Sequence, residues 1–323
     1  MRVATIDLGT NTVRLLVSDV EAGGVWRVVH ADQQVTRLGE GLTRAGVLGE
    51  PPMRRTAAVV SAYARRARNL GASQLRIVAT SAVREATNGA AFVAMVERAS
   101  GERVEVVSGE DEARLTVRGI LRGLGRLPGA MVTFDIGGGS TEYTLARDGT
   151  VIASVSLRLG VVPLAESFPF PDAVDFARYR TLVGEVASQL ERELPDTLGG
   201  RQPDQLIGTA GTVTTLAALD LGLPQYDAER VQGHRLDRAA VGRQLTRLGA
   251  LTVTERAALP CLEPGRADLI IPGIAIVQAT MARFGVDSMI VSDWGLREGM
   301  MDEAIESLRL GSAQREEKHE ARE

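Results

Sequence analysis

The sequence predicts an α/β protein built from two similar halves. A short polar motif occurs twice, as Asp7-Leu8-Gly9-Thr10-Asn11-Thr12 and as Asp135-Ile136-Gly137-Gly138-Gly139-Ser140-Thr141. The segments around each motif follow the same order of strands and helices, βββαβαβα, which indicates a duplication. With 323 residues, 44% of them hydrophobic, the chain is long enough to form two domains.

The first half is expected to begin with three strands. Each motif follows a short apolar run and precedes another, a pattern typical of two strands joined by a tight turn. The expected elements are strands at about 2–8, 12–19 and 25–36, a helix at 53–70, a strand at 75–79, a helix at 90–99, a strand at 103–107 and a helix from 110. Apolar residues of this last helix, from Ala113 to Leu124, recur with helical spacing.

The second half repeats this order with additions. Three strands are expected between 130 and 157, then helical segments to 194, a strand at 205–207, a helix at 212–221, inserted helices, a long apolar helix at 269–284, a strand at 288–291 and a closing helix from 296. The helical pattern breaks at Leu124-Gly125-Arg126-Leu127-Pro128-Gly129. We therefore expect domains at 1–126 and 127–310, with a last helix that can pack on the first domain, and a polar tail at 311–323.

The tips of the two predicted hairpins suit a phosphorylated ligand. Glycine lets backbone N–H groups come close to an anion, and the hydroxyl side chains add donors. The aspartate at each strand end, Asp7 or Asp135, can hold a divalent cation that neutralises phosphate charge. Asp-x-Gly is also ordinary turn chemistry. Two such turns in equivalent places nevertheless indicate that both halves bind the same phosphorylated ligand.

The composition excludes several classes of protein. No apolar stretch approaches ~18 residues and the chain enters a strand at once, so we expect no membrane span, no signal peptide and a cytoplasmic location. The single Cys261 excludes disulfides within the chain, and three scattered histidines leave no His-rich metal site. The only lysine, Lys318, lies in the tail, which excludes a Walker A loop and Schiff-base chemistry. A net charge of −4 and 4% aromatic residues argue against nucleic acid as a partner.

Two further segments, Ile77 to Arg84 and Leu206 to Thr212, end a strand in small or hydroxyl residues and then begin a helix. Such turns place backbone N–H groups toward an anion, although serine and threonine also cap ordinary helices. Arg84 is the better candidate in the first segment, because a guanidinium binds phosphate through two hydrogen bonds. An arginine at the surface is the simpler interpretation in so arginine-rich a chain.

Carboxylates near the predicted boundary are candidates for catalysis. Glu112 lies in the first turn of the helix from 110, where the helix dipole favours acidic residues and Ser108 with Asp111 resembles a capping box. Because the boundary follows this helix, its N-terminus could face a cleft in which a carboxylate positions water. Glu142, just after the second motif, either helps Asp135 to hold a cation or faces solvent.

Seven segments in order resemble one family. They are Ile6 to Leu15, Arg37 to Leu42, Ala79 to Arg84, Gly109 to Leu115, Asp135 to Glu142, Gly208 to Thr212 and Ser292 to Gly299. Over about residues 3–303 the chain is similar to the exopolyphosphatase and guanosine pentaphosphate phosphohydrolase (Ppx/GppA phosphatase) family. The resemblance implies the fold of actin, Hsp70 and sugar kinases, with two ribonuclease-H-like domains around an interdomain cleft.

The resemblance also implies roles for individual residues. Glu112 would be the general base, and Asp135, Glu142 and Asp7 would lie beside Mg²⁺. The residues expected to contact phosphate are Thr10, Asn11, Thr12, Arg84, Gly137, Gly138, Gly139, Ser140, Gly211 and Thr212. A homodimer is expected from the resemblance as well.

The chain departs from the family pattern in three ways. Thr10 and Thr12 stand where serine is usual, which keeps the hydroxyls and adds methyl groups. Trp294 occupies a position that is often polar or basic. The sequence ends without the C-terminal helical extension of longer members, so channelling of long polymers is not expected.

The sequence therefore predicts a magnesium-dependent hydrolase that removes the terminal phosphate of inorganic polyphosphate, with Glu112 orienting the water. Guanosine pentaphosphate is the alternative substrate, because both compounds end in a phosphoanhydride and no guanine pocket is evident. Two hypotheses come from other classes. One is a kinase or ATPase of the same fold. The other is a non-catalytic sensor of polyphosphate or alarmone, which would not need Glu112.

Overall fold

The computed structural model describes residues 1–21, 23–200 and 202–307, and the predicted polar tail at 311–323 lies outside them. The first half holds a five-stranded sheet in the order β3-β2-β1-β4-β5. Its strands are β1 (Arg2–Leu8), β2 (Thr12–Val20), β3 (Trp26–Val35), β4 (Gln74–Ala79) and β5 (Val104–Val106). Its helices are α1 (Leu42–Ala45), α2 (Glu50–Asn69), α3 (Ser81–Glu85), α4 (Gly89–Ser100) and α5 (Gly109–Leu124).

The second half holds a six-stranded sheet in the order β10-β11-β9-β6-β7-β8. Its strands are β6 (Ala130–Ile136), β7 (Thr141–Arg147), β8 (Thr150–Leu157), β9 (Gln205–Thr209), β10 (Arg235–Asp237) and β11 (Ser288–Val291). Its helices are α6 (Val161–Ser167), α7 (Phe176–Glu193), α8 (Asp196–Gly199), α9 (Ala210–Asp220), α10 (Ala228–Val231), α11 (Arg238–Gly249), α12 (Val253–Ala257), the 3-10 helix η1 (Pro264–Arg266) and α13 (Ile270–Arg283). Residues 296–307 form a last helix.

The two sheets share one topology, which confirms the predicted α/β duplication. In each half an antiparallel meander (β1-β2-β3 or β6-β7-β8) is extended by parallel strands beside its first strand. The second sheet adds β10, which pairs antiparallel with β11 at the edge. The sequence did not predict β10 or α1, because elements of three or four residues are too short to show a hydrophobic period. The helix α3 begins where the segment from Ile77 to Arg84 was expected to start one.

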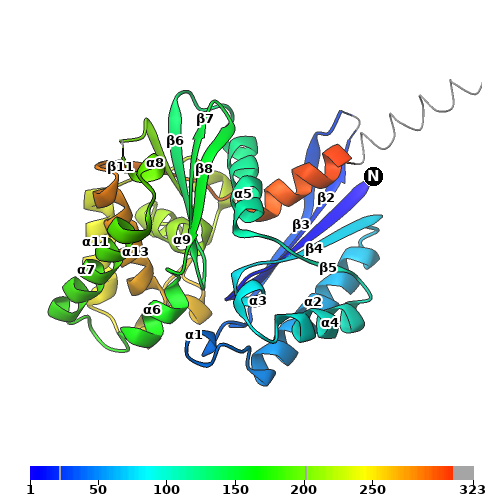
Figure 1. Ribbon diagram of the computed structural model, residues 1–323, viewed down its shortest axis with the longest axis horizontal. Helices are drawn as coiled ribbons and strands as arrows, with labels where there is room; N and C mark the ends of the chain where they lie inside the picture. The colour runs from blue at the N-terminus through cyan, green and yellow to red at the C-terminus, as the bar shows by residue number, and fades with distance from the viewer. Residues whose placement is uncertain (22, 201, 308–323) are drawn as a thin grey trace, which may run out of the picture.

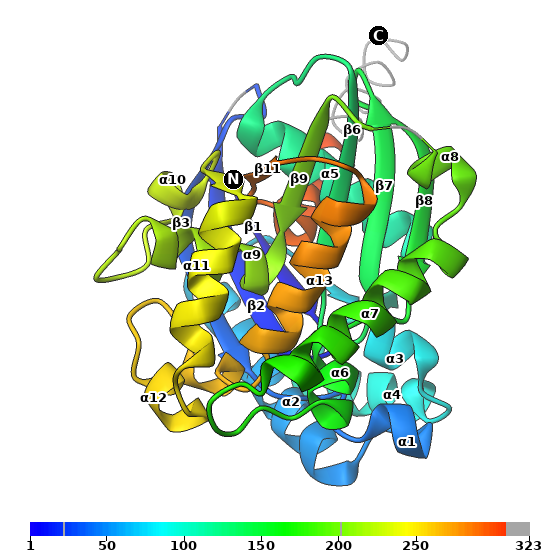
Figure 2. The same ribbon diagram turned by 90° about the vertical axis from the view of Figure 1, so that its left-hand side faces the viewer.

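Helices cover the sheets and bury two large cores. In the first half, α2 packs on β1, β2 and α4. In the second half, α7, α11 and α13 lie over the face of the sheet that points away from the first half (Figure 2). The apolar residues of α13 belong to this core, which accounts for the long hydrophobic run. None of the helices in the described ranges is long and apolar enough to span a bilayer.

The last helix and α5 lie side by side between the two sheets (Figure 1). Val117 and Ile120 of α5 pack on the second sheet, whereas Met301 and Ile305 of the last helix pack on Val3 and Leu16 of the first. The crossing depends on glycine. A Cβ on Gly119 would lie 2.0 Å from the carbonyl oxygen of Gly295, so any side chain there would force the two helices apart.

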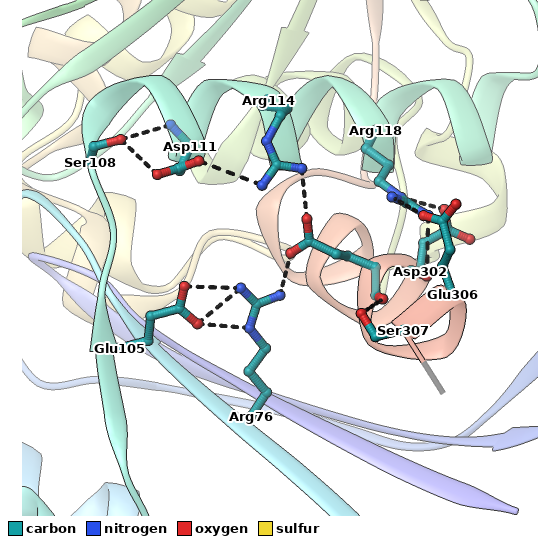
Figure 3. A network of polar contacts seen from close by, with 10 residues as sticks. Arg76, Glu105, Ser108, Asp111, Arg114, Arg118, Asp302, Glu306 and Ser307 are labelled. Atoms are coloured by element: carbon teal, nitrogen blue, oxygen red, sulfur yellow. Dashed lines mark hydrogen bonds and ion pairs between the residues drawn. The ribbon is translucent and has the colours of Figure 1, made fainter. Parts of the chain in front are cut away.

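Ion pairs hold the last helix against the first half (Figure 3). Glu303 accepts hydrogen bonds of 2.6 Å from both Arg76 of β4 and Arg114 of α5. Arg118 lies 2.6 Å from Asp302 and 2.8 Å from Glu306. Because these side chains form a network, the last helix is tied to both the first sheet and α5.

Trp294, the unusual residue before the last helix, has a structural role. Its ring stacks on Trp26 of β3, with ring centroids 4.9 Å apart. A Cβ on Gly123 of α5 would lie 2.9 Å from the Trp294 ring, so this glycine makes room for the stack. Trp294 therefore joins β3 of the first half to the segment that follows β11 of the second half.

Candidate active site

The two motif turns occupy equivalent places at the ends of β1 and β6 and meet face to face. Each is closed by the same hydrogen bond, from Gly9 to the Thr12 carbonyl and from Gly137 to the Ser140 carbonyl. A Cβ on Gly138 would lie 3.0 Å from the Cβ atoms of Asn11 and Thr10. Glycine at this position therefore allows the tips of the two hairpins to come together.

A cavity opens where the turns meet. It is lined by Asp7, Gly9, Thr10, Asn11, Thr12, Arg14, Thr80, Ser81, Glu112, Asp135, Ile136, Gly137, Gly138, Ser140, Val161, Ala210, Gly211, Thr212, Thr215, Leu262, Arg266, Leu269, Ile270 and Leu296. Most of the residues that the sequence nominated lie in this set. The lining combines backbone N–H groups, hydroxyls, carboxylates and two arginines, a mixture suited to a phosphate with a bound cation.

Glu112 enters the cavity from the first turn of α5. Ser108 caps this helix by accepting a hydrogen bond from the Asp111 N–H, as the capping pattern predicted. The Glu112 side chain is buried, and its Oε2 accepts a 2.9 Å hydrogen bond from Arg84 Nη1. Burial, and next the charge of Glu142, raise the pKa of Glu112 well above its usual range, whereas Arg84 opposes the rise. A carboxylate with a raised proton affinity and one fixed oxygen suits a general base.

Arg84 lies beside Glu112 and is anchored there. Its Nη1 also donates a 2.9 Å hydrogen bond to the Val107 carbonyl, so one nitrogen is shared between two acceptors. Three residues that the sequence nominated for the site are not among the described residues that line the cavity: Arg84, Gly139 and Glu142. Arg84 is therefore well placed to orient Glu112. To bind phosphate directly, Arg84 would have to use Nη2 or Nε.

Three further carboxylates surround the turns. Asp135 lies opposite Glu142 on the neighbouring strand, and burial followed by the Glu142 charge raises the pKa of Asp135 to about 7. Burial also raises the pKa of Asp7. Glu142 Oε1 accepts hydrogen bonds from Ser140 at 2.6 Å and from Ser156 at 2.7 Å. So much buried negative charge is unfavourable unless a cation binds close by.

Comparisons with known proteins identify the family of this chain. The model of the Ppx/GppA phosphatase family matches residues 16–308. The chain belongs to this family. Exopolyphosphatase 2 of Mycobacterium tuberculosis is 36% identical over 316 residues, which cover 93% of this chain and 97% of that protein. Exopolyphosphatase 1 of Mycobacterium leprae is 30% identical, over 97% of this chain and 92% of its own length.

A solved structure supports the same assignment. The crystal structure of the Aquifex aeolicus member of the Ppx/GppA family matches with a TM-score of 0.80 and 30% identity, over 95% of this chain and 98% of that one. The two-domain fold that the resemblance implied is therefore confirmed, as is the family itself.

Sequence reasoning did not select two arginines that line the cavity of this Ppx/GppA member. Arg14 lies opposite Asp7 on β2, the place that Glu142 holds opposite Asp135 on β7. Arg14 follows Asp7 by the same number of residues as Glu142 follows Asp135. The duplication could therefore have identified Arg14 as a candidate site residue. Arg266 is different. It comes from η1 in a long connection, and no local pattern marks it.

Arg266 reaches across the cleft to the first half. Its Nη2 donates a 3.0 Å hydrogen bond to the Thr12 hydroxyl, and its Nε lies 3.2 Å from Glu263. Burial, and next the nearby charge of Arg14, lower the pKa of Arg266 to about 10. A Cβ on Gly211 would lie 1.7 Å from Arg266 Nη1, so glycine at the start of α9 makes room for the guanidinium. Arg266 and Arg14 are two cations beside one cavity, and this local positive charge favours a bound anion.

The donors of the site suit Mg²⁺ that arrives with phosphate. Within the ranges the structure describes, no three His, Cys, Asp or Glu side chains form a ready-made metal cage. Mg²⁺ does not need one, because it is usually held by one or two carboxylates, waters and substrate phosphates. Asp7 and Asp135 both line the cavity, and burial raises the pKa of each although the charge of Arg14 opposes the rise.

Proposed function

We propose that this Ppx/GppA phosphatase removes the terminal phosphate of inorganic polyphosphate by hydrolysis. The observation that carries the proposal is that Glu112 and both phosphate turns line one cavity. The two relatives described above, which match more than nine tenths of the chain, are exopolyphosphatases, which favours the same activity here.

The terminal phosphate would bind between the two turns. Backbone N–H groups of 10–12, 138 and 140 and the Thr10 and Thr12 hydroxyls would donate to its oxygens. The N-terminus of α9, at Gly211 and Thr212, and the Arg266 guanidinium would contact the next phosphate along the chain. These groups are aimed at charge that shifts toward the leaving oxygen during the reaction.

Glu112 would orient a water for in-line attack and accept its proton. Arg84 acts as a positioning residue, because its hydrogen bond leaves the second Glu112 oxygen free to face the cavity. Phosphoryl transfer passes through a loose transition state, so exact placement of the base matters more than its strength.

We also propose Mg²⁺ as the cofactor, held by Asp7 and Asp135 with Glu142 close by. Bound there, the ion would neutralise phosphate charge and polarise the bond that is cleaved. The protein residues hold the phosphates and the water in place around it.

Guanosine pentaphosphate is a second candidate substrate, favoured by one observation. A further cavity of about 660 Å³ adjoins the first and shares Arg14 and Arg266 with it. Tyr226, Asp293 and Gln225 lie on its wall, so it offers both a ring and hydrogen-bonding groups. A pocket of this size accepts a nucleoside.

A side-by-side assay of phosphate release separates these functions. Tripolyphosphate, long-chain polyphosphate, guanosine pentaphosphate and ATP are compared at equal concentration with Mg²⁺. We expect the fastest release from short polyphosphate without any acceptor, because the phosphate-binding donors lie around one cavity, and we expect release to stop when the metal is chelated. Preference for guanosine pentaphosphate would promote the second candidate. ATP consumption only with an acceptor would indicate a kinase, and binding without release would indicate a sensor.

Replacement of Arg266 by methionine tests the buried cation. We expect the KM for tripolyphosphate to rise by about tenfold, because a charge-assisted contact is lost. The melting temperature without ligand should change little, since loss of the contacts with Glu263 and Thr12 is offset by removal of a buried charge. The rise in melting temperature on adding tripolyphosphate should shrink.

The control for this change is Arg243→Met, on the exposed face of α11 in the same half. It removes an equal charge far from Thr12 and should leave KM unchanged. Equal effects of the two variants would mean that Arg266 acts only through the overall charge of the protein.

Two sequence predictions need separate experiments. A homodimer is proposed from the family resemblance, and light scattering at micromolar concentration would contradict it by reporting a monomer. The proposed cytoplasmic location calls for cell fractionation.

A further inference from the structure

A short segment of the second half clasps the first half beside the phosphate cavity. This clasp, residues 263–268, includes η1 and carries Arg266. Glu263 accepts a 3.3 Å hydrogen bond from Gln33 of β3. A Cβ on Gly265 would lie 3.0 Å from the Val35 side chain, so the clasp backbone touches the end of the strand.

The strongest contact of the clasp is a bidentate ion pair. Arg37 donates hydrogen bonds of 3.0 and 2.8 Å to the two carboxylate oxygens of Asp268, and a third of 3.0 Å to the Gly265 carbonyl. The hydrogen bonds to Asp268 raise the pKa of Arg37. A guanidinium that holds both a carboxylate and a backbone carbonyl fixes distance and orientation together.

On the other side, Arg37 belongs to the loop that supports the first phosphate turn. The backbone N–H groups of Thr36 and Arg37 both donate 2.9 Å hydrogen bonds to the Asn11 carbonyl, and Gly39 donates one of 2.8 Å to the Thr10 carbonyl. Arg37 has a φ of 51°, a left-handed conformation that is costly for a residue with a side chain. The backbone of the loop is therefore fixed at Arg37, the residue that forms the ion pair with Asp268.

We infer that the Arg37–Asp268 pair is a positioning device that sets Arg266 against the Thr10–Thr12 turn and so keeps the cleft in its substrate-binding arrangement. Neither partner is among the described residues that line the phosphate cavity, so neither would touch the substrate. The pair connects the loop that hydrogen-bonds to the Thr10–Thr12 turn with the segment that carries the Arg266 guanidinium. This inference rests on the proposed function for its kinetic readout.

The role predicts a split between KM and kcat. Without the pair, a smaller fraction of the molecules would hold Arg266 against the Thr10–Thr12 turn. The apparent affinity for substrate would fall in proportion to this binding-competent fraction. At saturating substrate the cleft is closed by the ligand itself. For Asp268→Asn we therefore expect the KM for tripolyphosphate to rise by about three- to tenfold, with kcat within about twofold of the wild type.

The chain offers a matched control. Arg2 and Asp19 form another bidentate pair, at 2.8 and 2.9 Å, within the first sheet. Its side chains are 30% and 50% exposed, against 36% and 35% for Arg37 and Asp268. Asp19→Asn thus breaks a comparable pair that does not link the halves, and both KM and kcat should stay unchanged.

A second measurement does not depend on turnover. Amide hydrogen exchange of 36–39 without substrate should quicken in Asp268→Asn and not in Asp19→Asn, because the loop loses its tie to the clasp. The double variant Arg37→Met with Asp268→Asn should raise KM no further than the larger single change, since the two residues act as a unit.

The outcomes separate this inference from the proposed function. If the wild type binds tripolyphosphate by calorimetry without hydrolysing it, the proposed function fails, and the dissociation constant replaces KM in the same comparison. If exchange and affinity respond alike in Asp268→Asn and Asp19→Asn, the positioning role is overturned whatever the activity. A fall in kcat with unchanged KM would overturn it as well.

Discussion

Replacement of Glu112 by glutamine should reduce kcat by roughly 10²- to 10⁴-fold, the usual contribution of a general base. The amide keeps the shape of the side chain and an oxygen that can accept the Arg84 hydrogen bond, so the two phosphate turns stay in place. The affinity for tripolyphosphate should stay within a few-fold of the wild type. Single-turnover phosphate release and calorimetry measure the two quantities separately.

The control is Glu110→Gln, which makes the same chemical change on an exposed residue in the same helical turn. Both substitutions remove one negative charge near the N-terminus of α5, so both lose the same favourable interaction with the helix dipole. If they lower turnover equally, or if Glu112→Gln lowers affinity as much as turnover, Glu112 serves the helix and not the reaction.

Replacement of Asp135 by asparagine should have opposite effects with and without Mg²⁺. With Mg²⁺ present, we expect the half-saturating magnesium concentration to rise at least roughly tenfold and turnover to fall, because an amide is a weaker ligand than a carboxylate. With the metal chelated, binding of tripolyphosphate should instead strengthen, because one negative charge beside the phosphates is gone. Calorimetry with and without Mg²⁺ detects this reversal.

Asp148→Asn is the matched change in the same sheet, at the turn between β7 and β8 and outside the motif. It should leave both titrations unaltered. A magnesium titration for Asp135→Asn that overlies the wild-type curve would show that Asp135 does not serve the ion.

Local patterns explain why so much of the fold was predictable. The strands β1, β2 and β6 flank turns whose glycine, aspartate and hydroxyl residues are strong local signals. The bounds of β1 and β2 agree with the prediction within about a residue, and β6 begins at Ala130, where the first strand of the second half was expected. The long apolar run of α13 was equally clear, although its place in the core of the second half depends on contacts with α7 and α9.

The site was predictable only in part, for the same reason. Thr10, Gly138 and Asp135 lie in turns with a recognisable local chemistry, and the structure brings them to one cavity. Arg84 was nominated because a guanidinium binds phosphate, yet in the structure its hydrogen bonds go to Glu112 and the Val107 carbonyl. A local pattern identifies a residue type in a turn and does not say which distant side chain will meet it.

By itself the sequence determined the α/β duplication, the two Asp-x-Gly turns and the family, because these depend on periodicity and on residues close together along the chain. Only the tertiary structure decided that Arg266 reaches Thr12, that Trp294 stacks on Trp26 and that Arg37 binds Asp268. Each of these contacts joins residues more than 200 positions apart, and such pairs are brought together by the packing of the two halves, which no local pattern encodes.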